Sequence, residues 1–412
     1  VARLGNTQTT RPLDPSQGRR ERDRAQEQLQ QMNWQAFGPR KETDAFGTET
    51  WTQEHRIGSC GRPLGARVAI SRAAAKGGDG HRGVYSGVET CGSATGCMKC
   101  ARKVRAEKSG NIGLVIRTHL DRGGFALFLT LTFAHTLADS AEDSLDDALT
   151  AWSTMVATRR WKKLIAWLGD SGWIRATETT HTDANGYHPH HHVCLLTDRA
   201  VGHDEDDPME LEDLRQEIYD CWSLALDKLD REAHSSSIGV DIEPVRDDEG
   251  IGAYVSKIEF EIARGDLKRG RGDSRSMWQV ALDAADGCQR SMAIWADYVR
   301  AAKGRRWLST SQGLWDEFGI NDRTDEEIAE DEPDEPEPVA FLDADVYTAA
   351  AKSEAPVLTE IRHLVEANAP IVVLAIVLSK RLGRTVEIER RAEDEGLPTL
   401  VWAEARPVRS DE

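Results

Sequence analysis

The sequence has no apolar run long enough to cross a membrane. Its longest, Ile371–Leu378, is eight residues, whereas a membrane-spanning helix needs roughly 20. The N-terminal segment lacks the apolar stretch of a secretory signal. Cysteine is scarce, with seven in 412 residues, four of them before residue 101, which argues against a disulfide framework. These features predict a cytoplasmic protein without membrane association.

The chain also lacks the net positive charge expected of a DNA-binding protein. Its net charge is −18, but residues 321–412 hold 23 acidic and 10 basic residues, which leaves a net charge of −5 for residues 1–320. Basic residues gather at 102–108, 159–163, 264–275 and 300–306. Because phosphate binding depends on local positive patches, the overall acidity weakens a DNA-binding hypothesis without excluding it.

Composition and charge divide the chain into five predicted segments. The first is polar and mostly flexible with one helix around 19–31, the second is rich in cysteine and glycine, and the third is the regular centre with a basic helical extension. An acidic, proline-rich linker and a small C-terminal module of unknown role follow. Their bounds are 1–55, 56–120, 121–320, 321–341 and 342–412.

The centre alternates strand and helix patterns. Apolar residues at every second position predict strands, and apolar residues at helical spacing predict helices. The resulting order is βαββαβα, an α+β fold with an antiparallel sheet in a ferredoxin-like split βαβ arrangement. The predicted strands are 125–133, 173–180, 188–196 and 239–245, and the predicted helices are 144–168, 211–229 and 251–263.

The third of these strands carries four histidines in GYHPHHHVCLL. Because alternate side chains of a strand share a face, His188, His190 and His192 point one way and His191 the other. Two imidazoles on one face can hold a metal ion if a carboxylate completes the set. The alternative is a solvated histidine tract.

Glu178 is the candidate third ligand, and hairpin register decides its role. A five-residue connection, Thr182–Gly186, pairs Glu178 with His190. A two-residue Asn-Gly turn would instead make Glu178 face away, because a slip of one residue moves every side chain to the other face. If the turn is of the second kind, Glu178 is a surface carboxylate.

Tyr254 lies on the apolar face of the 251–263 helix, and Lys257 follows one turn later. A tyrosine in this place is ordinarily a core residue. As a nucleophile it would need a nearby cation, because a phenol of ordinary pKa near 10 is mostly protonated at neutral pH. Its position after the histidine hairpin favours the second interpretation.

Two other groups suggest binding sites. Cys60, Cys91, Cys97 and Cys100 can form a structural Zn²⁺ site, with His55 and His81 as spare ligands, or remain reduced thiols. Basic residues follow Tyr254 and, further on, alternate with Trp295, Tyr298 and Trp307. This pattern suits single-stranded DNA, or else a solvated helix face packed by aromatic residues. The candidate DNA-binding residues are Arg264, Lys268, Arg269, Arg271, Arg305 and Arg306.

FLTLT (128–132), the hairpin GYHPHHHVCLL and AYVSK (253–257) together resemble the three motifs of HUH endonucleases. More specifically, the chain resembles rolling-circle replication initiators (Rep proteins) of actinobacterial plasmids, over about 58–320. The resemblance implies that His190 and His192, with Glu178, hold Mg²⁺ or Mn²⁺. It also implies that Tyr254 is the nucleophile, with Lys257 as an electrostatic helper; His188 fits the motif less well.

Such an enzyme nicks one origin strand, forms a 5′-phosphotyrosyl bond and frees a 3′-hydroxyl that primes synthesis. The implied partners are plasmid origin DNA, double- and single-stranded, and a host helicase and DNA polymerase. Some relatives place a glutamate four residues before the tyrosine, where this chain has Gly250; Glu249 lies one residue away. The alternatives are an HUH relaxase or transposase, or a non-enzymatic zinc-containing DNA-binding regulator.

Overall fold

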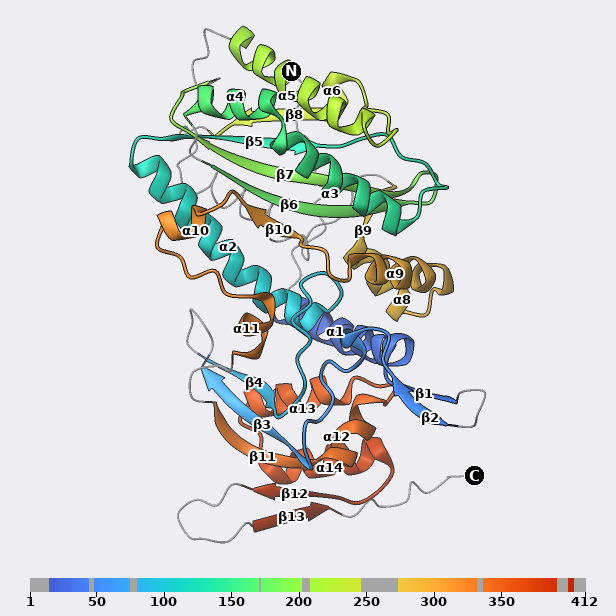
Figure 1. Ribbon diagram of the computed structural model, residues 1–412. Coiled ribbons are helices and arrows are strands. Elements are labelled where there is room, and N and C mark those ends of the chain that lie inside the picture. Colours follow the sequence, from blue (N-terminus) through green and yellow to red (C-terminus); the bar gives the residue numbers. More distant parts are fainter. Residues whose placement is uncertain are drawn as a thin grey trace. The chain divides into compact units, whose positions relative to one another are not determined.

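The computed structural model describes residues 15–43, 48–74, 80–169, 172–201, 208–245, 273–331, 336–390 and 399–403 (Figure 1). The chain forms two compact units. Unit 1 combines Val1–Cys91 with Glu330–Glu412, and unit 2 is the continuous segment Gly92–Ala329. Both contain antiparallel sheets packed with helices, so the predicted α+β class is confirmed. Among the described residues, no helix has both the length and the apolar character that a membrane crossing requires.

The sheet of unit 2 contains one hairpin of two neighbouring strands. One helical crossover connection leads into this hairpin and a second leads out of it. Its order is β10-β6-β7-β5-β8, with β9 pairing the free part of β6, and all neighbouring strands are antiparallel. The strands are β5 (Phe125–Leu131), β6 (Trp173–Thr182), β7 (Gly186–Thr197), β8 (Val240–Pro244), β9 (Arg275–Ser276) and β10 (Leu308–Thr310).

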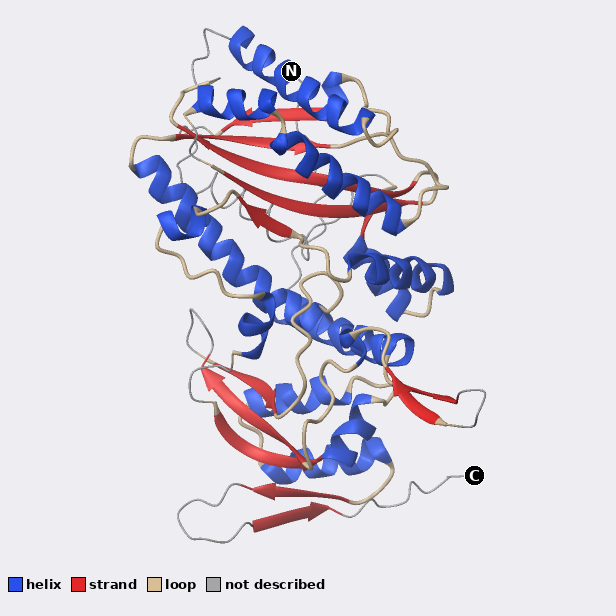
Figure 2. Ribbon diagram, viewed as in Figure 1, coloured by secondary structure: helices blue, strands red, loops and turns tan. Residues whose placement is uncertain are grey.

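Helices connect these strands and cover one face of the sheet, as Figure 2 shows. The chain runs from β5 through α3 and α4 to β6, turns into β7, and reaches β8 through α5 and α6. The predicted 144–168 helix is interrupted at Thr158, whose side chain accepts a hydrogen bond from Trp161 N and so begins a new helix. The bounds are α3 (Ala141–Ala157), α4 (Arg159–Leu168), α5 (Pro208–Asp227) and α6 (Ser236–Gly239).

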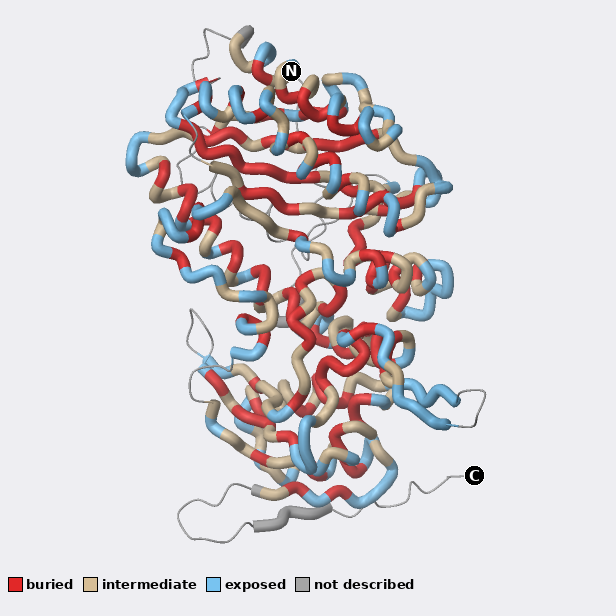
Figure 3. Tube along the Cα trace, in the orientation of Figure 1, coloured by how far each residue is buried: buried red, intermediate tan, exposed pale blue. Residues whose placement is uncertain are grey.

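The core of unit 2 lies between this sheet face and helices α3, α4 and α5. The predicted alternation in β5 is confirmed, since Leu127, Leu129 and Leu131 all point into the core. Trp152 of α3 and Trp222 of α5 fill the space above them. In Figure 3 buried and partly buried residues alternate along most strands of this sheet, and β7 is buried along nearly its whole length. A sheet fixed in this way by apolar packing is a rigid support for side chains on its other face.

Further helices of unit 2 flank the sheet. Helix α2 packs against β5, and α8 packs against α9 and β6. Lys108 of α2 forms an ion pair of 2.9 Å with Asp322, in the segment that leads out of the unit. The bounds are α2 (Met98–Asp121), α8 (Met277–Ala285), α9 (Gln289–Ala302), α10 (Leu314–Glu317) and α11 (Asp325–Glu330).

Unit 1 joins segments from the two ends of the sequence in one antiparallel sheet, of order β13-β12-β11-β3-β4. Residues 342–412, expected to be a separate module, therefore share a sheet with strands from the expected cysteine-rich segment, and β11 begins inside the expected linker. Helices α12, α13 and α14 supply the core on this sheet. The strands are β3 (Arg67–Ala74), β4 (His81–Ser86), β11 (Glu337–Asp343), β12 (Val386–Arg390) and β13 (Thr399–Ala403).

The remaining elements of unit 1 begin with a long helix, α1, which contains the helix expected around 19–31 and extends beyond it at both ends. Glu27 of α1 accepts hydrogen bonds from the amides of Leu358 and Thr359, at 3.1 and 2.8 Å, and so satisfies the first turn of α13. The bounds are α1 (Pro15–Phe37), β1 (Arg40–Thr43), β2 (Glu49–Thr52), the 3-10 turn η1 (Arg56–Gly58), α12 (Ala344–Ala351), α13 (Val357–Glu366) and α14 (Ile371–Leu382).

Candidate metal centre

The β6–β7 hairpin has the register that brings Glu178 opposite His190. The innermost recorded pair is Thr182 with Gly186, which leaves three residues in the turn. Gly186 adopts a left-handed backbone conformation, with φ 77°, as glycine does at low cost. The amide of Asn185 donates to the Thr182 hydroxyl at 2.9 Å. The two-residue Asn-Gly turn is therefore not formed, and Glu178 lies on the same face as His190 and His192.

Three donor groups converge on this face. Glu178 Oε2 lies 3.3 Å from His190 Nε2 and 3.2 Å from His192 Nε2. One ligand atom from each residue lies within 4.8 Å of the other two. The side chains are mostly buried, with 16%, 12% and 8% of their surfaces exposed respectively. Two imidazole nitrogens and a carboxylate oxygen suit a divalent ion such as Mg²⁺, Mn²⁺ or Zn²⁺.

His188 shares the face of this trio but has different partners. Its Nε2 is hydrogen-bonded to the Thr132 hydroxyl, and its ring stacks on His135 with centroids 4.3 Å apart. Burial, followed by the nearby His190, lowers the pKa of His188 to about 3. His188 is therefore neutral and held away from the three converging atoms, in keeping with its poorer fit to the motif.

His191 faces the opposite side of the sheet, as the alternation predicts. Its Nε2 donates to the carbonyl of Ala148 in α3 at 2.8 Å, and its Nδ1 lies 3.1 Å from the Thr177 hydroxyl. The ring packs edge-on against Trp152 and Trp222. Burial, together with the positive charge of Arg175, holds the pKa of His191 well below its ordinary value. This histidine is a neutral core residue.

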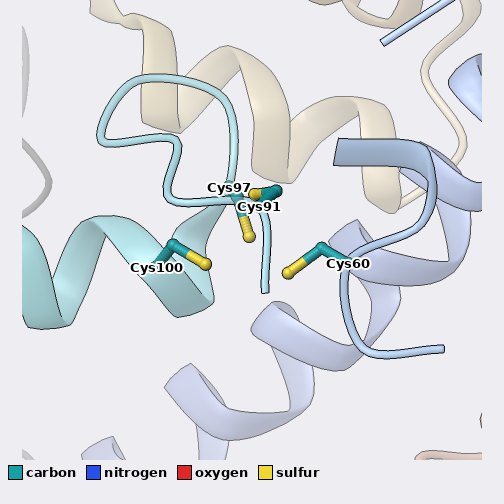
Figure 4. Close-up of side chains that lie close together, drawn as sticks. All are labelled: Cys60, Cys91, Cys97 and Cys100. Atoms are coloured by element: carbon teal, nitrogen blue, oxygen red, sulfur yellow. The ribbon is translucent and has the colours of Figure 1, made fainter. Parts of the chain in front are cut away.

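The four early cysteines also converge. Cys60 follows the 3-10 turn η1, Cys91 follows β4, Cys97 is the N-cap of α2, and Cys100 lies in its first turn. All four are buried, and their sulfur atoms lie within 4.8 Å of one another (Figure 4). His55 is not among them; its Nδ1 accepts a hydrogen bond from the amide of Ile57. Four convergent thiols match the ligand set of a structural zinc ion.

Comparison with known proteins gives a consistent result. Residues 88–205 match the Rep_1 family of replication proteins, and this segment contains three of the four clustered cysteines and the whole hairpin. A protein named "Protein rep" from Streptomyces lividans is 25% identical over 298 residues. Over these parts, the chain is similar to Rep replication proteins.

The extent of these matches is partial. The alignment with the S. lividans protein covers 58% of this chain and 65% of that protein. A protein of Streptomyces cyanogenus, named "Neomycin resistance protein", is 33% identical over 27% of this chain and 31% of its own length. This chain thus aligns with less than two thirds of each curated relative. No solved structure gives a significant match.

Several sequence-predicted residues fall outside the part of this chain that the structure describes. The segment 246–272 contains Tyr254 and Lys257, as well as Glu249, Arg264, Lys268, Arg269 and Arg271. The roles expected of these residues remain predictions.

The basic and aromatic stretch around residue 305 is described, and it differs from expectation. Arg305 is engaged within unit 2, through an ion pair of 2.6 Å with Asp146. Trp295, Tyr298 and Trp307 are buried, with 1%, 8% and 6% of their surfaces exposed. Of the two alternatives that the sequence left open, this burial favours a helix face packed by aromatic residues over aromatic side chains that stack on bases.

Sequence reasoning also missed the residues in and directly after β5 that contact the histidines. Thr130 and Thr132 are hydrogen-bonded to His192 and His188, and Phe128 stacks on His192. The signal was present in FLTLT, because positions 128, 130 and 132 alternate with the core leucines and so share the opposite face.

Proposed function

We propose that this protein is a plasmid rolling-circle replication initiator that nicks one origin strand with Tyr254. The observation that carries the proposal is the convergence of Glu178, His190 and His192 on one face of the hairpin, inside the segment that matches replication proteins. A surface histidine tract would not place two imidazoles and a largely enclosed carboxylate, 16% exposed, around one point.

The strand order supports a ferredoxin-like HUH core. Strands β5 and β6 are joined through α3 and α4, with β7 between them in the sheet, while β8 returns through α5 to the other side of β5. This connectivity supports the split βαβ arrangement that the order of predicted elements suggested. It places the hairpin histidines on a central strand, where packing holds them in position.

In this proposal His190, His192 and Glu178 hold Mg²⁺ or Mn²⁺. The donor set fits such an ion, because one carboxylate and two neutral nitrogens leave positions open for phosphate oxygens. When bound, the ion supplies positive charge that stabilises the developing charge on the scissile phosphate and the leaving oxygen.

The covalent step is a transesterification. The Tyr254 oxygen bonds to phosphorus as the bond from phosphorus to the 3′-oxygen breaks. The phenol loses its proton, and the released 3′-oxygen takes up a proton to become the 3′-hydroxyl. The 5′-phosphotyrosyl ester retains the phosphodiester energy, so a later 3′-hydroxyl can rejoin the strand. Lys257, three residues after Tyr254 in the sequence, is assigned the role of favouring the phenolate electrostatically.

The four-cysteine cluster is proposed to hold a structural Zn²⁺. Because all four thiols are buried and close together, their thiolates would repel one another without a cation. The proposed ion stabilises the segment that leads into α2 and takes no part in strand cleavage.

The proposed partners are double- and single-stranded plasmid origin DNA, with a host helicase and a DNA polymerase acting after the nick. Contacts to the DNA backbone are assigned to the basic residues between 264 and 271 and to Arg306. Arg305 is left out of this set because it already pairs with Asp146.

The test is incubation of the full chain with end-labelled single-stranded origin DNA and Mn²⁺, followed by denaturing electrophoresis. The expected result is a covalent protein–DNA adduct that is lost in Tyr254→Phe and retained in the control Tyr219→Phe, a tyrosine of α5 packed on the core. Cleavage without an adduct would contradict the proposal. Origin binding that is unaffected by Tyr254→Phe, with no cleavage by either protein, would instead identify a non-enzymatic regulator.

A further inference from the structure

Strand β5 presents a row of side chains to the histidine row of β7. In the antiparallel register Thr130 lies directly opposite His192, so their side chains share a face. Phe128, two positions earlier, lies on this face too, and Thr132, the first residue after β5, directs its hydroxyl at His188. This row therefore lies beside the histidines of β7.

Two members of the row contact His192 itself. The Thr130 hydroxyl lies 3.3 Å from His192 Nδ1. The Phe128 ring stacks on the imidazole with centroids 5.6 Å apart and an interplanar angle of 12°. The hydroxyl and the stacked ring fix the rotation of the imidazole and leave its Nε2 directed at Glu178, 3.2 Å away.

The chemistry of imidazole gives the Thr130 contact a specific consequence. A histidine that binds a metal through Nε2 carries its proton on Nδ1 and donates it to a neighbouring acceptor. A threonine hydroxyl can accept that hydrogen bond, and it can also donate when the proton is on Nε2. The Thr130 contact is therefore compatible with His192 both with and without an ion.

We propose that Thr130 is a positioning residue for the metal centre, holding His192 in the tautomer and orientation that present Nε2 to the ion. The inference rests on the proposed metal-binding role of His190, His192 and Glu178. His190 differs from His192 in this respect, because its Nδ1 lies 3.4 Å from a main-chain oxygen, that of His188, which no substitution removes. Thr130 is thus the partner that mutagenesis can test.

The experiment measures Mn²⁺ affinity of the full chain without DNA, from the electron paramagnetic resonance signal of free Mn²⁺. Thr130→Val keeps the branched shape and removes the hydroxyl, and Thr130→Ser restores the hydroxyl. The matched control is Thr177→Val, which removes the same kind of threonine–histidine bond, to His191 on the opposite face. Thr130→Ala repeats the test if the valine perturbs folding, and urea unfolding of every variant checks this.

We expect Thr130→Val to weaken Mn²⁺ binding roughly 10- to 100-fold, the usual effect of removing a hydrogen-bond partner of a metal-bound histidine. Thr130→Ser and Thr177→Val should bind Mn²⁺ as the unmodified protein does. Equal weakening by Thr130→Val and Thr177→Val would overturn the inference, since it would reflect general loosening of the sheet. Unchanged affinity in Thr130→Val would overturn it as well.

A further variant separates this inference from the proposed function. His192→Ala should abolish Mn²⁺ binding if the trio holds the ion. If His192→Ala binds Mn²⁺ normally, the metal site itself is misplaced and the proposed function fails. If His192→Ala loses binding but Thr130→Val does not, only the positioning role fails.

Discussion

Replacing His191 with leucine should destabilise the protein without affecting metal binding. The substitution removes two buried hydrogen bonds, to the carbonyl of Ala148 and the hydroxyl of Thr177, at 2.8 and 3.1 Å. Each contributes about 1 kcal/mol net, and a buried group left without its partner costs about 1–3 kcal/mol. Ala148 lies within α3 and keeps its helical hydrogen bond, and leucine fills most of the volume. The expected loss is therefore about 2 kcal/mol.

Urea unfolding followed by tryptophan fluorescence measures this loss, because Trp152 and Trp222 contact the imidazole, with ring centroids 5.9 Å away in each case. Mn²⁺ affinity is measured on the same samples. A variant that unfolds at the same urea concentration as the unmodified protein would refute the neutral, hydrogen-bonded role of His191. A variant that keeps its stability but loses Mn²⁺ binding would refute the assignment of His191 to the core face.

Three further predictions concern the turn, an ion pair and the cysteines. Gly186→Ala should lower the free energy of unfolding by about 1–2 kcal/mol, because φ is 77° there; an unchanged urea midpoint would contradict this. Burial alone would raise the pKa of Asp139, but hydrogen bonds led by that from Arg231 outweigh it and lower the pKa. An acid with a lowered pKa stabilises the fold above its unfolded pKa, and this stability is lost as the pH falls through the folded pKa. Arg231→Met should therefore lower the free energy of unfolding by about 1 kcal/mol at pH 7. Measured by urea unfolding, the difference in this free energy between the variant and the unmodified protein should shrink below about pH 4. A difference that stays constant with pH would argue against this role of the ion pair. Elemental analysis should find bound zinc in the unmodified protein but not in Cys100→Ser. The control Cys288→Ser, which removes an exposed thiol, should keep its zinc. Zinc retained in Cys100→Ser would argue against the four-thiol site.

The hairpin shows how far local sequence patterns reach. Alternation alone put His191 on one face and His190 and His192 on the other, and the structure confirms that division and shows that His191 is on the core face. The position of Glu178 needed the register, which the sequence narrowed to two alternatives. The Asn-Gly pair favoured the tighter turn. The structure has the five-residue connection Thr182–Gly186 instead, with three residues between its paired ends. The reason is that the long flanking strands gain more from burying their apolar faces than a preferred turn contributes.

Long-range pairing set the limit of prediction elsewhere. Nothing near β3 indicates that its neighbour is β11, which begins at Glu337, since hydrophobic alternation identifies a strand but not its partner. For a related reason, the sequence could not decide the role of the aromatic residues near Arg305. Spacing alone does not distinguish a tryptophan that stacks on bases from one buried against a helix, such as Trp295.

The sheet of unit 1 also affects how the protein can fold during synthesis. About 260 residues separate the end of β3 from the start of β11, so at about 5–20 residues per second β3 emerges from the ribosome roughly 13–50 s before its partner. Unit 2 is continuous and can complete its sheet in that interval, whereas one edge of β3 has to wait for β11. During this time the nascent chain exposes an unpaired strand edge, a feature that favours aggregation and chaperone binding. The hairpin of unit 2 can therefore form early in synthesis, whereas the sheet of unit 1 can form only after β11, β12 and β13 have been synthesised.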